Sequence, residues 1–256
     1  MTPLLIVLRQ SPDWSRITRQ EYCEHSREFC DLIGRPRDQM NEIVELWDST
    51  FRVSYFETRQ RMKDIAKCNL ASVRNAEIVD HRDFKPEGGR AICFVDDDDW
   101  LAPDLGEHLD CRLGYDGFIW THVAVGSPTF PLHRWPAGES EWLCFTNNYA
   151  VSDEYARKNG IEHVAQHWAA DSVFRSLRID SIPLPLSVAN KHPASVVFLE
   201  RNMESQLTHD KIKQVLATFV GETRSVDEHS LTGIEWAGPM IGAVNHHFEQ
   251  VLASKY

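Results

Sequence analysis

Two continuous apolar runs limit the fold of this chain more than any other feature of its sequence. Residues 4–8 are Leu-Leu-Ile-Val-Leu, and residues 90–95 are Arg-Ala-Ile-Cys-Phe-Val. A strand with one face in water would alternate apolar and polar residues, and neither run does. Runs of this kind are typical of parallel strands that helices cover on both faces. The sequence therefore predicts an α/β fold around an interior sheet.

Further strands and helices alternate along the chain. Helical spacing occupies residues 59–73, where Met62, Ile65 and Leu70 fall on one face together with Ala66. We expect further strands at 76–79, 117–125, 143–151 and 179–186, and further helices at 15–33, 153–158, 169–177, 204–220 and 239–254. Pro183 and Pro185 interrupt the last strand, and residues 126–140 are expected to form a loop. This alternation favours a mixed, mostly parallel sheet flanked by helices, with one domain over 1–195 and a helical extension over 196–256 packed on it.

Charge and composition exclude several classes of protein. The chain has 256 residues and a formal net charge of -11, which disfavours nucleic acid as the main partner. No segment has the ~18 apolar residues of a membrane span, and the first apolar run lacks the charged start and cleavage site of a signal peptide. The six cysteines form no C-x-x-C pair, which is typical of free thiols in a reducing cytoplasm.

Four aspartates, Asp96 to Asp99, follow the second apolar run directly and precede Trp100. Adjacent carboxylates raise one another's pKa, and the flanking apolar residues hinder their spreading into water. A divalent cation would relieve this repulsion, because Mg²⁺ and Mn²⁺ bind carboxylates together with substrate phosphates. Alternate side chains of a strand share a face, so Asp96 and Asp98 are expected to point the same way. A solvated acidic turn or a helix-capping cluster is the alternative.

Residues 94–104, Phe-Val-Asp-Asp-Asp-Asp-Trp-Leu-Ala-Pro-Asp, resemble the DXD segment of family-2-like glycosyltransferases. The resemblance implies a GT-A fold, which is Rossmann-like and binds nucleotide-diphosphate sugars. It implies that Asp96 contacts the nucleoside side of the donor and belongs to the metal site, and that Asp98 binds a Mn²⁺ or Mg²⁺ ion bridging the donor diphosphate. Asp97 and Asp99 become supporting carboxylates of the donor site.

Two further segments are similar to the same family, so that the resemblance covers roughly residues 55–195. Residues 167–177 are similar to the acidic segment that supplies the catalytic base, although Ala170 stands where the family has glutamate and only Asp171 is retained. His192 corresponds to a late histidine that completes the metal shell. Asp171 as base implies an inverting reaction, and a retaining one stays open if it points elsewhere. Residues 8–12 depart from the family's Pro-x-Tyr-Asn start.

The resemblance implies a metal-dependent glycosyltransferase that moves a sugar onto a glycan, a lipid-linked glycan or another hydroxyl acceptor, as in bacterial surface polysaccharide synthesis. Arginines can clamp phosphates, although exposed helix charges are the alternative for each of them. The candidates are Arg9, Arg59 and Arg61. Aromatic and amide side chains suit sugar rings and hydroxyls, with core packing and turns as the alternatives. The acceptor-site candidates are Trp100, Trp142, Asn147, Asn148 and Trp168.

Two other functions remain open at this point. A non-catalytic carbohydrate- or metal-binding module would use the same aspartates and tryptophans. A phosphatase of the haloacid-dehalogenase type also places Asp-x-Asp after an apolar strand, but it prefers threonine or valine at the position of Trp100. The acidic C-terminal helices disfavour a membrane surface and suit a lid, a packing pair or a homodimer contact.

Overall fold

One mixed sheet organises the part of the chain that the computed structural model describes. That part comprises residues 4–18, 20–22, 24, 55–85, 89–110, 116–127, 130–135, 147–158, 179–195, 209–224 and 231–254. Its strands are β1 (Leu4–Arg9), β2 (Ala76–Asp80), β3 (Ala91–Asp96), β4 (Trp100–Leu101), β5 (Gly117–Ser127), β6 (Phe130–Trp135), β7 (Tyr149–Ser152) and β8 (Ile179–Asn190). Its helices are α3 (Tyr55–Leu70), α4 (Leu105–Asp110), α5 (Asp153–Lys158), α8 (His209–Arg224), the 3₁₀ turn η1 (Glu235–Ala237) and α9 (Gly238–Ala253).

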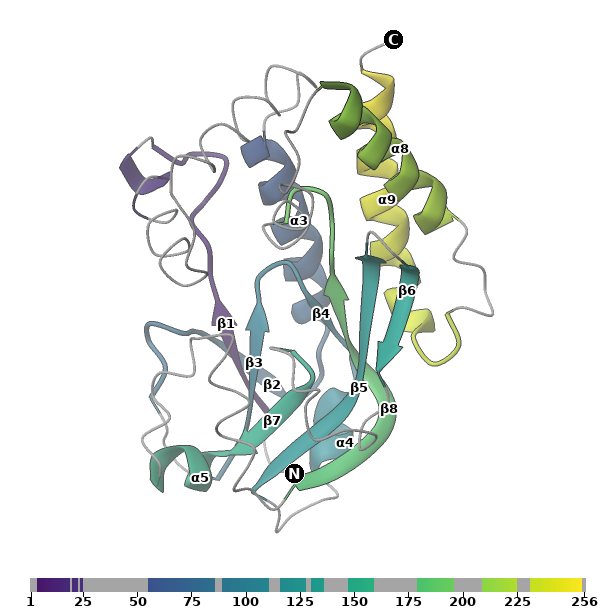
Figure 1. Cartoon of the computed structure of the whole chain (residues 1–256). Coiled ribbons are helices and arrows are strands. Elements are labelled where there is room, and N and C mark those ends of the chain that lie inside the picture. The colour runs from purple at the N-terminus through teal and green to yellow at the C-terminus, as the bar shows by residue number, and fades with distance from the viewer. Residues whose placement is uncertain are drawn as a thin grey trace.

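The sheet confirms the predicted mixed α/β architecture. Its order is β2-β1-β3-β7-β5-β8-β4, and β6 pairs with β5. The pairs β1–β2, β1–β3 and β5–β8 are parallel, whereas β4, β6 and β7 run antiparallel to their neighbours. Figure 1 shows that β1, β3, β5 and β8 end at the same side of the sheet. Ligands of such sheets bind beyond this edge, so the chain segments that leave these four strands are the first place to look for a site.

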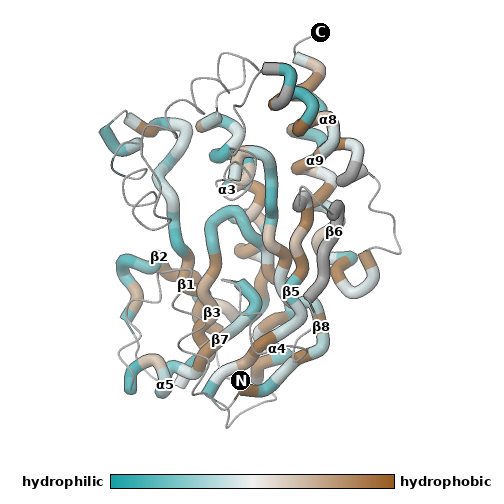
Figure 2. Tube along the Cα trace, in the orientation of Figure 1, coloured by the Kyte–Doolittle hydropathy of each residue, from teal (hydrophilic) through white to brown (hydrophobic). Residues whose placement is uncertain are grey.

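The two apolar runs form the interior strands that they predict. Leu4, Leu5 and Ile6 of β1 and Ile92 and Cys93 of β3 are at most 2% exposed. Figure 2 shows both strands as hydrophobic and the chain beyond their ends as hydrophilic. The two strands pair in register, with Leu4 opposite Ala91 and Arg9 opposite Asp96. The register therefore places an arginine beside the first aspartate of the acidic run.

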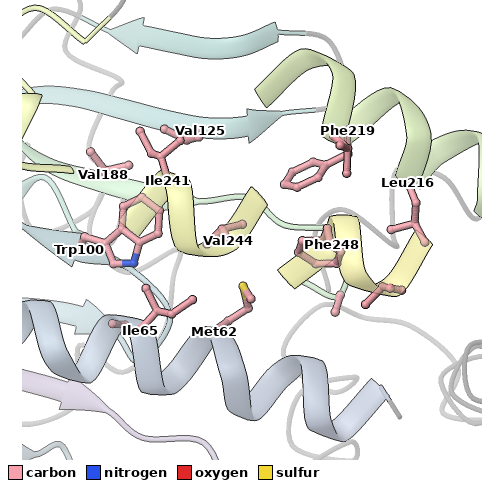
Figure 3. Close-up of a cluster of buried hydrophobic side chains, with 14 of the residues drawn as sticks. Met62, Ile65, Trp100, Val125, Val188, Leu216, Phe219, Ile241, Val244 and Phe248 are labelled. Atoms are coloured by element: carbon pink, nitrogen blue, oxygen red, sulfur yellow. The ribbon is translucent and has the colours of Figure 1, made fainter. Parts of the chain in front are cut away.

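Helices α3, α8 and α9 share one core with the strands. Met62 and Ile65 of α3 pack with Trp100, Val188 and Phe248. Figure 3 shows these side chains converging from α3, from the strands β4 and β8, and from α9. On the other side of the sheet, a smaller cluster joins Leu5, Phe94 and Tyr149 to Ala156 of α5. The predicted C-terminal helices are confirmed in α8 and α9, with boundaries shifted by a few residues. No helix within the described ranges has the length and apolar character that crossing a bilayer requires.

Two strand predictions need correction. Residues 130–135 form β6 instead of a loop, and among the described strands β6 pairs with β5 alone, where an edge position tolerates Pro131. β8 continues to Asn190, past the two prolines that were expected to break it. The pairing of β5 with β8 jumps from Ile182 to Ser187, so the prolines lie where no regular ladder partner is needed. Of the helix predicted over 15–33, residues 20–22 and 24 are helical, and the rest of its length is either non-helical or outside the described residues.

At Gly126, β5 comes close to Phe219 of α8 and to Lys191, which follows β8. The φ of Gly126 is 81°, and a Cβ there would lie 2.6 Å from the carbonyl oxygen of Lys191 and would overlap the ring of Phe219. We expect Gly126→Ala to lower the free energy of unfolding by about 2–4 kcal/mol, since it combines backbone strain with overpacking. Urea denaturation measures this change.

Gly242 provides the matched control for that substitution. It lies within α9, and a Cβ there would meet nothing within 4 Å. Gly242→Ala should leave stability unchanged or raise it by up to about 1 kcal/mol, because alanine favours the helix. Equal effects at both positions would contradict the proposed close approach at Gly126.

Candidate functional site

The acidic run forms a tight turn between β3 and β4, and the turn separates its side chains. The amide of Asp99 donates to the carbonyl of Asp96 over 3.2 Å, which reverses the chain. Asn69 of α3 then fixes β4, since its amide donates to the carbonyl of Leu101 and its oxygen accepts from the amide of the same residue. Asp96 and Asp98 keep side-chain exposures of 24% and 17%, whereas Asp97 and Asp99 are buried. Each of the four carboxylates consequently meets a different set of partners.

Asp96 pairs with Arg9, its neighbour on β1. A guanidinium nitrogen of Arg9 contacts a carboxylate oxygen of Asp96, and the arginine side chain is 12% exposed. The pairing follows directly from the register of the two parallel strands. The structure thus places Arg9, the first of the three predicted arginines, at the acidic turn.

Asp97 ties the segment after β1 to helix α3. One of its oxygens accepts from the amide and the hydroxyl of Ser11 over 2.8 and 2.6 Å, and Lys63 lies 3.2 Å from the same oxygen. Lys63 also donates to the carbonyl oxygens of Ser11 and Pro12. Burial, then the charge of Asp98, raise the pKa of Asp97 against the opposing effect of Lys63 and Ser11. This carboxylate therefore ties Ser11, just after β1, to Lys63 of α3.

Asp98 meets His192 and Arg59 through a single oxygen. Its Oδ2 lies 3.2 Å from Nε2 of His192 and 3.5 Å from a guanidinium nitrogen of Arg59. Although burial opposes ionisation, the hydrogen bond with His192 and the charge of Arg59 hold the pKa of Asp98 well below its usual range. Burial lowers the pKa of His192, so its ring is neutral near pH 7. An ionised carboxylate and a neutral imidazole are the protonation states in which both groups bind metals.

Asp99 fastens the end of β8 to the turn. Its two oxygens accept from the amide of Asn190 and from the side-chain amide of Asn147, each over 2.9 Å. Burial raises the pKa of Asp99, and the charge of Asp98 adds to this effect. Because Asn190 lies two residues before His192, the bond from its amide positions the histidine against Asp98. Phe248 of α9 stacks against the imidazole ring of His192, and the two ring centroids are 6.4 Å apart.

The donor set at Asp98 and His192 suits a divalent ion that brings further ligands with it. Two neighbouring ligands of an octahedral ion, each about 2.1 Å from the metal, lie about 3 Å apart. The 3.2 Å between Oδ2 of Asp98 and Nε2 of His192 is close to that spacing. Among the described residues, no three His, Cys, Asp or Glu side chains group closely enough to hold a metal alone. Phosphate oxygens and water would therefore have to complete the shell.

The four aspartates are stabilised by protein partners, contrary to the expectation that they need a cation. Four unpaired carboxylates would need a cation to be tolerated, but Asp96, Asp97 and Asp98 each have a basic partner and Asp99 has two amide donors. The fold thus stabilises the acidic turn without an added ion. A metal site has to be argued from the Asp98–His192 geometry instead.

Several predicted site residues have other roles or lie elsewhere. Trp100 is fully buried in the core beside Met62 and Val188, which leaves no face for a sugar. Asn147 and Asn148 are at most 1% exposed; Asn147 binds Asp99, and Asn148 donates to the carbonyl of Trp120. These two asparagines and Trp100 are therefore not available to contact a sugar acceptor, contrary to the prediction. Arg61 is exposed on α3. Burial, and after it the charge of Arg61, lower the pKa of His247. Asp171, Trp142 and Trp168 lie outside the described residues.

Lys63 and Ser11 are site residues that the sequence analysis did not identify. Lys63 follows Arg59 by four positions, so both share one face of α3. That spacing was a usable signal once Arg59 was a candidate. Ser11 had no signal of its own, because its role depends on how the chain turns after β1.

Removing the Asp99 carboxylate tests its role as a structural fastener. We expect Asp99→Ala to lower the free energy of unfolding by about 2–4 kcal/mol, since two buried donors lose their acceptor. Asp104→Ala is the control: this side chain is 42% exposed and pairs with His108 on the surface, so a change within about 0.5 kcal/mol is expected. Chemical denaturation measures both variants, and an unaffected Asp99→Ala would contradict the assigned role.

Comparisons with known proteins give a distant structural likeness. No protein-family model matches the chain, and no curated protein matches it. Among solved structures, TarS of S. aureus in complex with UDP-GlcNAc aligns with 70% of this chain and 54% of its own chain, at 12% identity and a TM-score of 0.34. A second structure of S. aureus TarS aligns with 98% of this chain and 83% of its own, at 13% identity and a TM-score of 0.35. A shared activity does not follow from likeness at this level.

Proposed function

We propose that this chain is a metal-dependent glycosyltransferase that uses a nucleotide-diphosphate sugar. One observation carries the proposal: Asp98 and His192, from the ends of two different strands, meet at the carboxyl edge of the sheet with Arg59 beside them. This is the edge at which open α/β sheets bind ligands. The acidic turn that supplies Asp98 is also the segment that resembles a DXD motif. The site therefore combines a metal-binding pair with cations suited to phosphate.

Asp98 and His192 would hold a Mn²⁺ or Mg²⁺ ion in this proposal. The ion would act as a Lewis acid and stabilise the charge that develops on the leaving diphosphate. The ionised Asp98 is ready to bind it, whereas the neutral His192, whose Nε2 proton faces Asp98 in the metal-free site, would bind it after that proton moves to Nδ1. Asp99, through the end of β8, and Phe248, through ring stacking, keep the imidazole in place. The protein thus supplies two oriented ligands and leaves the other positions to the donor.

Two further partly exposed side chains, Arg59 of α3 and Asp96 of the turn, would contact the donor in this proposal. Arg59 is 11% exposed and can offer guanidinium donors to a phosphate. Asp96 is held by Arg9 and keeps 24% exposure, which suits an acceptor of hydrogen bonds from ribose hydroxyls. We assign the removal of the acceptor proton to Asp171, which makes the reaction inverting. The acceptor class is the hydroxyl of a glycan or lipid-linked glycan, as in surface polysaccharide synthesis.

A thermal-shift screen tests the proposal. UDP, GDP, dTDP and CMP are each added with and without Mn²⁺, together with UDP-GlcNAc. A diphosphate at a hundred times its dissociation constant stabilises the native state by about 2.7 kcal/mol, which for a chain of this size is about 5–10 °C. We expect one diphosphate to give such a shift only when Mn²⁺ is present.

Two companion assays test the alternatives. Stabilisation by free glycans, added in the same melting assay, without any effect of nucleotides indicates a binding module, and release of phosphate from an aryl phosphate indicates a phosphatase. A screen in which no nucleotide changes the melting temperature contradicts the transferase proposal.

Substitution of the metal pair should remove the Mn²⁺-dependent shift. Asp98→Asn loses the charge and His192→Gln loses the imidazole, so we expect neither variant to gain stability from a diphosphate and Mn²⁺ together. Asp104→Asn removes a surface carboxylate after β4 and serves as the control, because Asp104 pairs with His108 and has no contact with the metal pair. A native shift in both pair variants would show that the metal, if bound, lies elsewhere.

Asp171→Asn separates donor binding from the chemical step. We expect the melting shift with a diphosphate and Mn²⁺ to equal that of the native protein, because Asp171 is assigned to the acceptor side. Release of free nucleoside diphosphate from the sugar donor should fall by about a hundredfold or more, as expected for loss of a general base. Full release by this variant would show that another group takes the proton.

A further inference from the structure

Arg59 and an incoming metal ion would compete for the same atom. Arg59 contacts Oδ2 of Asp98, and Nε2 of His192 faces that same oxygen. A cation bound between Asp98 and His192 would therefore lie beside the guanidinium in a mostly buried setting, where like charges repel strongly. In the metal-free site, the guanidinium of Arg59 already balances the negative charge of Asp98.

Two other basic side chains at the turn, those of Arg9 and Lys63, are held more firmly. Arg9 makes a close contact with Asp96, and Lys63 has Asp97 and two carbonyl oxygens as partners. Arg59 lies 3.5 Å from Asp98, a longer contact than that of either Arg9 with Asp96 or Lys63 with Asp97. Of these three cations, Arg59 is therefore the one whose partner can be exchanged at least cost.

Trp14 gives Arg59 a second contact that does not fix its direction. The guanidinium carbon lies 5.1 Å from the centroid of the Trp14 ring. A cation over an aromatic face can shift without losing the attraction, unlike one that depends on aligned hydrogen bonds. Trp14 is itself held by Ser11 and Gln60, so the surface under the guanidinium stays in place. Arg59 can consequently turn from Asp98 towards an anion nearby.

We infer that Arg59 is an exchangeable internal counter-ion, which keeps metal affinity low until an anionic diphosphate draws it away from Asp98. The inference rests on the proposed function, because it assigns the metal to Asp98 and His192 and the diphosphate to the donor. Three of the four aspartates are already paired with cations, so the one remaining carboxylate cannot balance both charges of a divalent ion that arrives alone. A metal–diphosphate complex brings its own negative charge and offers Arg59 a new partner. Metal and diphosphate therefore bind cooperatively, and each tightens the other by the same factor.

Separate titrations of the metal and of the nucleotide test this inference. Free Mn²⁺ is counted by electron paramagnetic resonance in solutions of protein and Mn²⁺ alone, and UDP affinity is measured by calorimetry at saturating Mn²⁺. For Arg59→Gln we expect Mn²⁺ alone to bind about tenfold more tightly than to the native protein, and UDP to bind about tenfold more weakly. The two affinities change in opposite directions, which a general loss of structure would not produce.

Two further variants complete the experiment. Lys67→Gln removes an exposed charge from the same helix, and both affinities should stay within about twofold of native. Arg59→Lys keeps the charge, so Mn²⁺ alone should bind as weakly as to the native protein, while UDP loses the paired contact that only a guanidinium makes. This variant keeps the inference open to refutation if Arg59→Gln fails to fold. Tighter Mn²⁺ binding by Arg59→Lys would overturn it.

The counter-ion role and the transferase activity fail in different ways. Unchanged or weaker Mn²⁺ binding by Arg59→Gln overturns the counter-ion role, whatever the nucleotide does. If the native protein binds no nucleoside diphosphate with Mn²⁺, the transferase proposal falls, and the Mn²⁺ titration of Arg59→Gln still decides whether Arg59 opposes a cation at Asp98.

Discussion

The structure depends on how the turn after β3 distributes four neighbouring carboxylates. Asp96 pairs with β1, Asp97 holds the segment after β1, Asp98 meets α3 and the residues after β8, and Asp99 fastens the end of β8. Adjacent carboxylates would destabilise a fold if they faced one another. Here each one instead joins a different part of the chain to the same edge of the sheet. The acidic turn is therefore the structural centre of the site as well as its chemical one.

This arrangement also connects the C-terminal helices to the site. Phe248 of α9 stacks on His192 and packs against Phe219 of α8, while Met62 of α3 belongs to the same core. The imidazole is fully buried, so its direction is set by this packing together with the anchored end of β8. Helices α8 and α9, which supply no ligand in this proposal, thus help to orient His192.

The sequence predicted those parts of the fold that depend on local pattern. The apolar runs of β1 and β3, the apolar face of α3 and the position of the aspartates at a strand end were all visible in it. The expectation that His192 completes a metal shell came from a resemblance; the structure places its Nε2 3.2 Å from Asp98, and metal binding by the two stays a prediction. Local pattern could not show that Trp100 faces the core or that Asn147 serves Asp99, because both facts depend on distant partners. The course of β8 past its prolines depends likewise on the irregular pairing with β5.

We propose that Asp98 and His192 jointly bind the metal of a nucleotide-diphosphate site. The most direct test is pulsed electron paramagnetic resonance of Mn²⁺ bound to the protein with UDP, which detects nitrogen and phosphorus nuclei near the ion. We expect coupling to one imidazole nitrogen and to phosphorus, with the nitrogen signal absent in the His192→Gln protein. Phosphorus coupling without any nitrogen signal from the native protein would show that His192 is not a ligand of the ion.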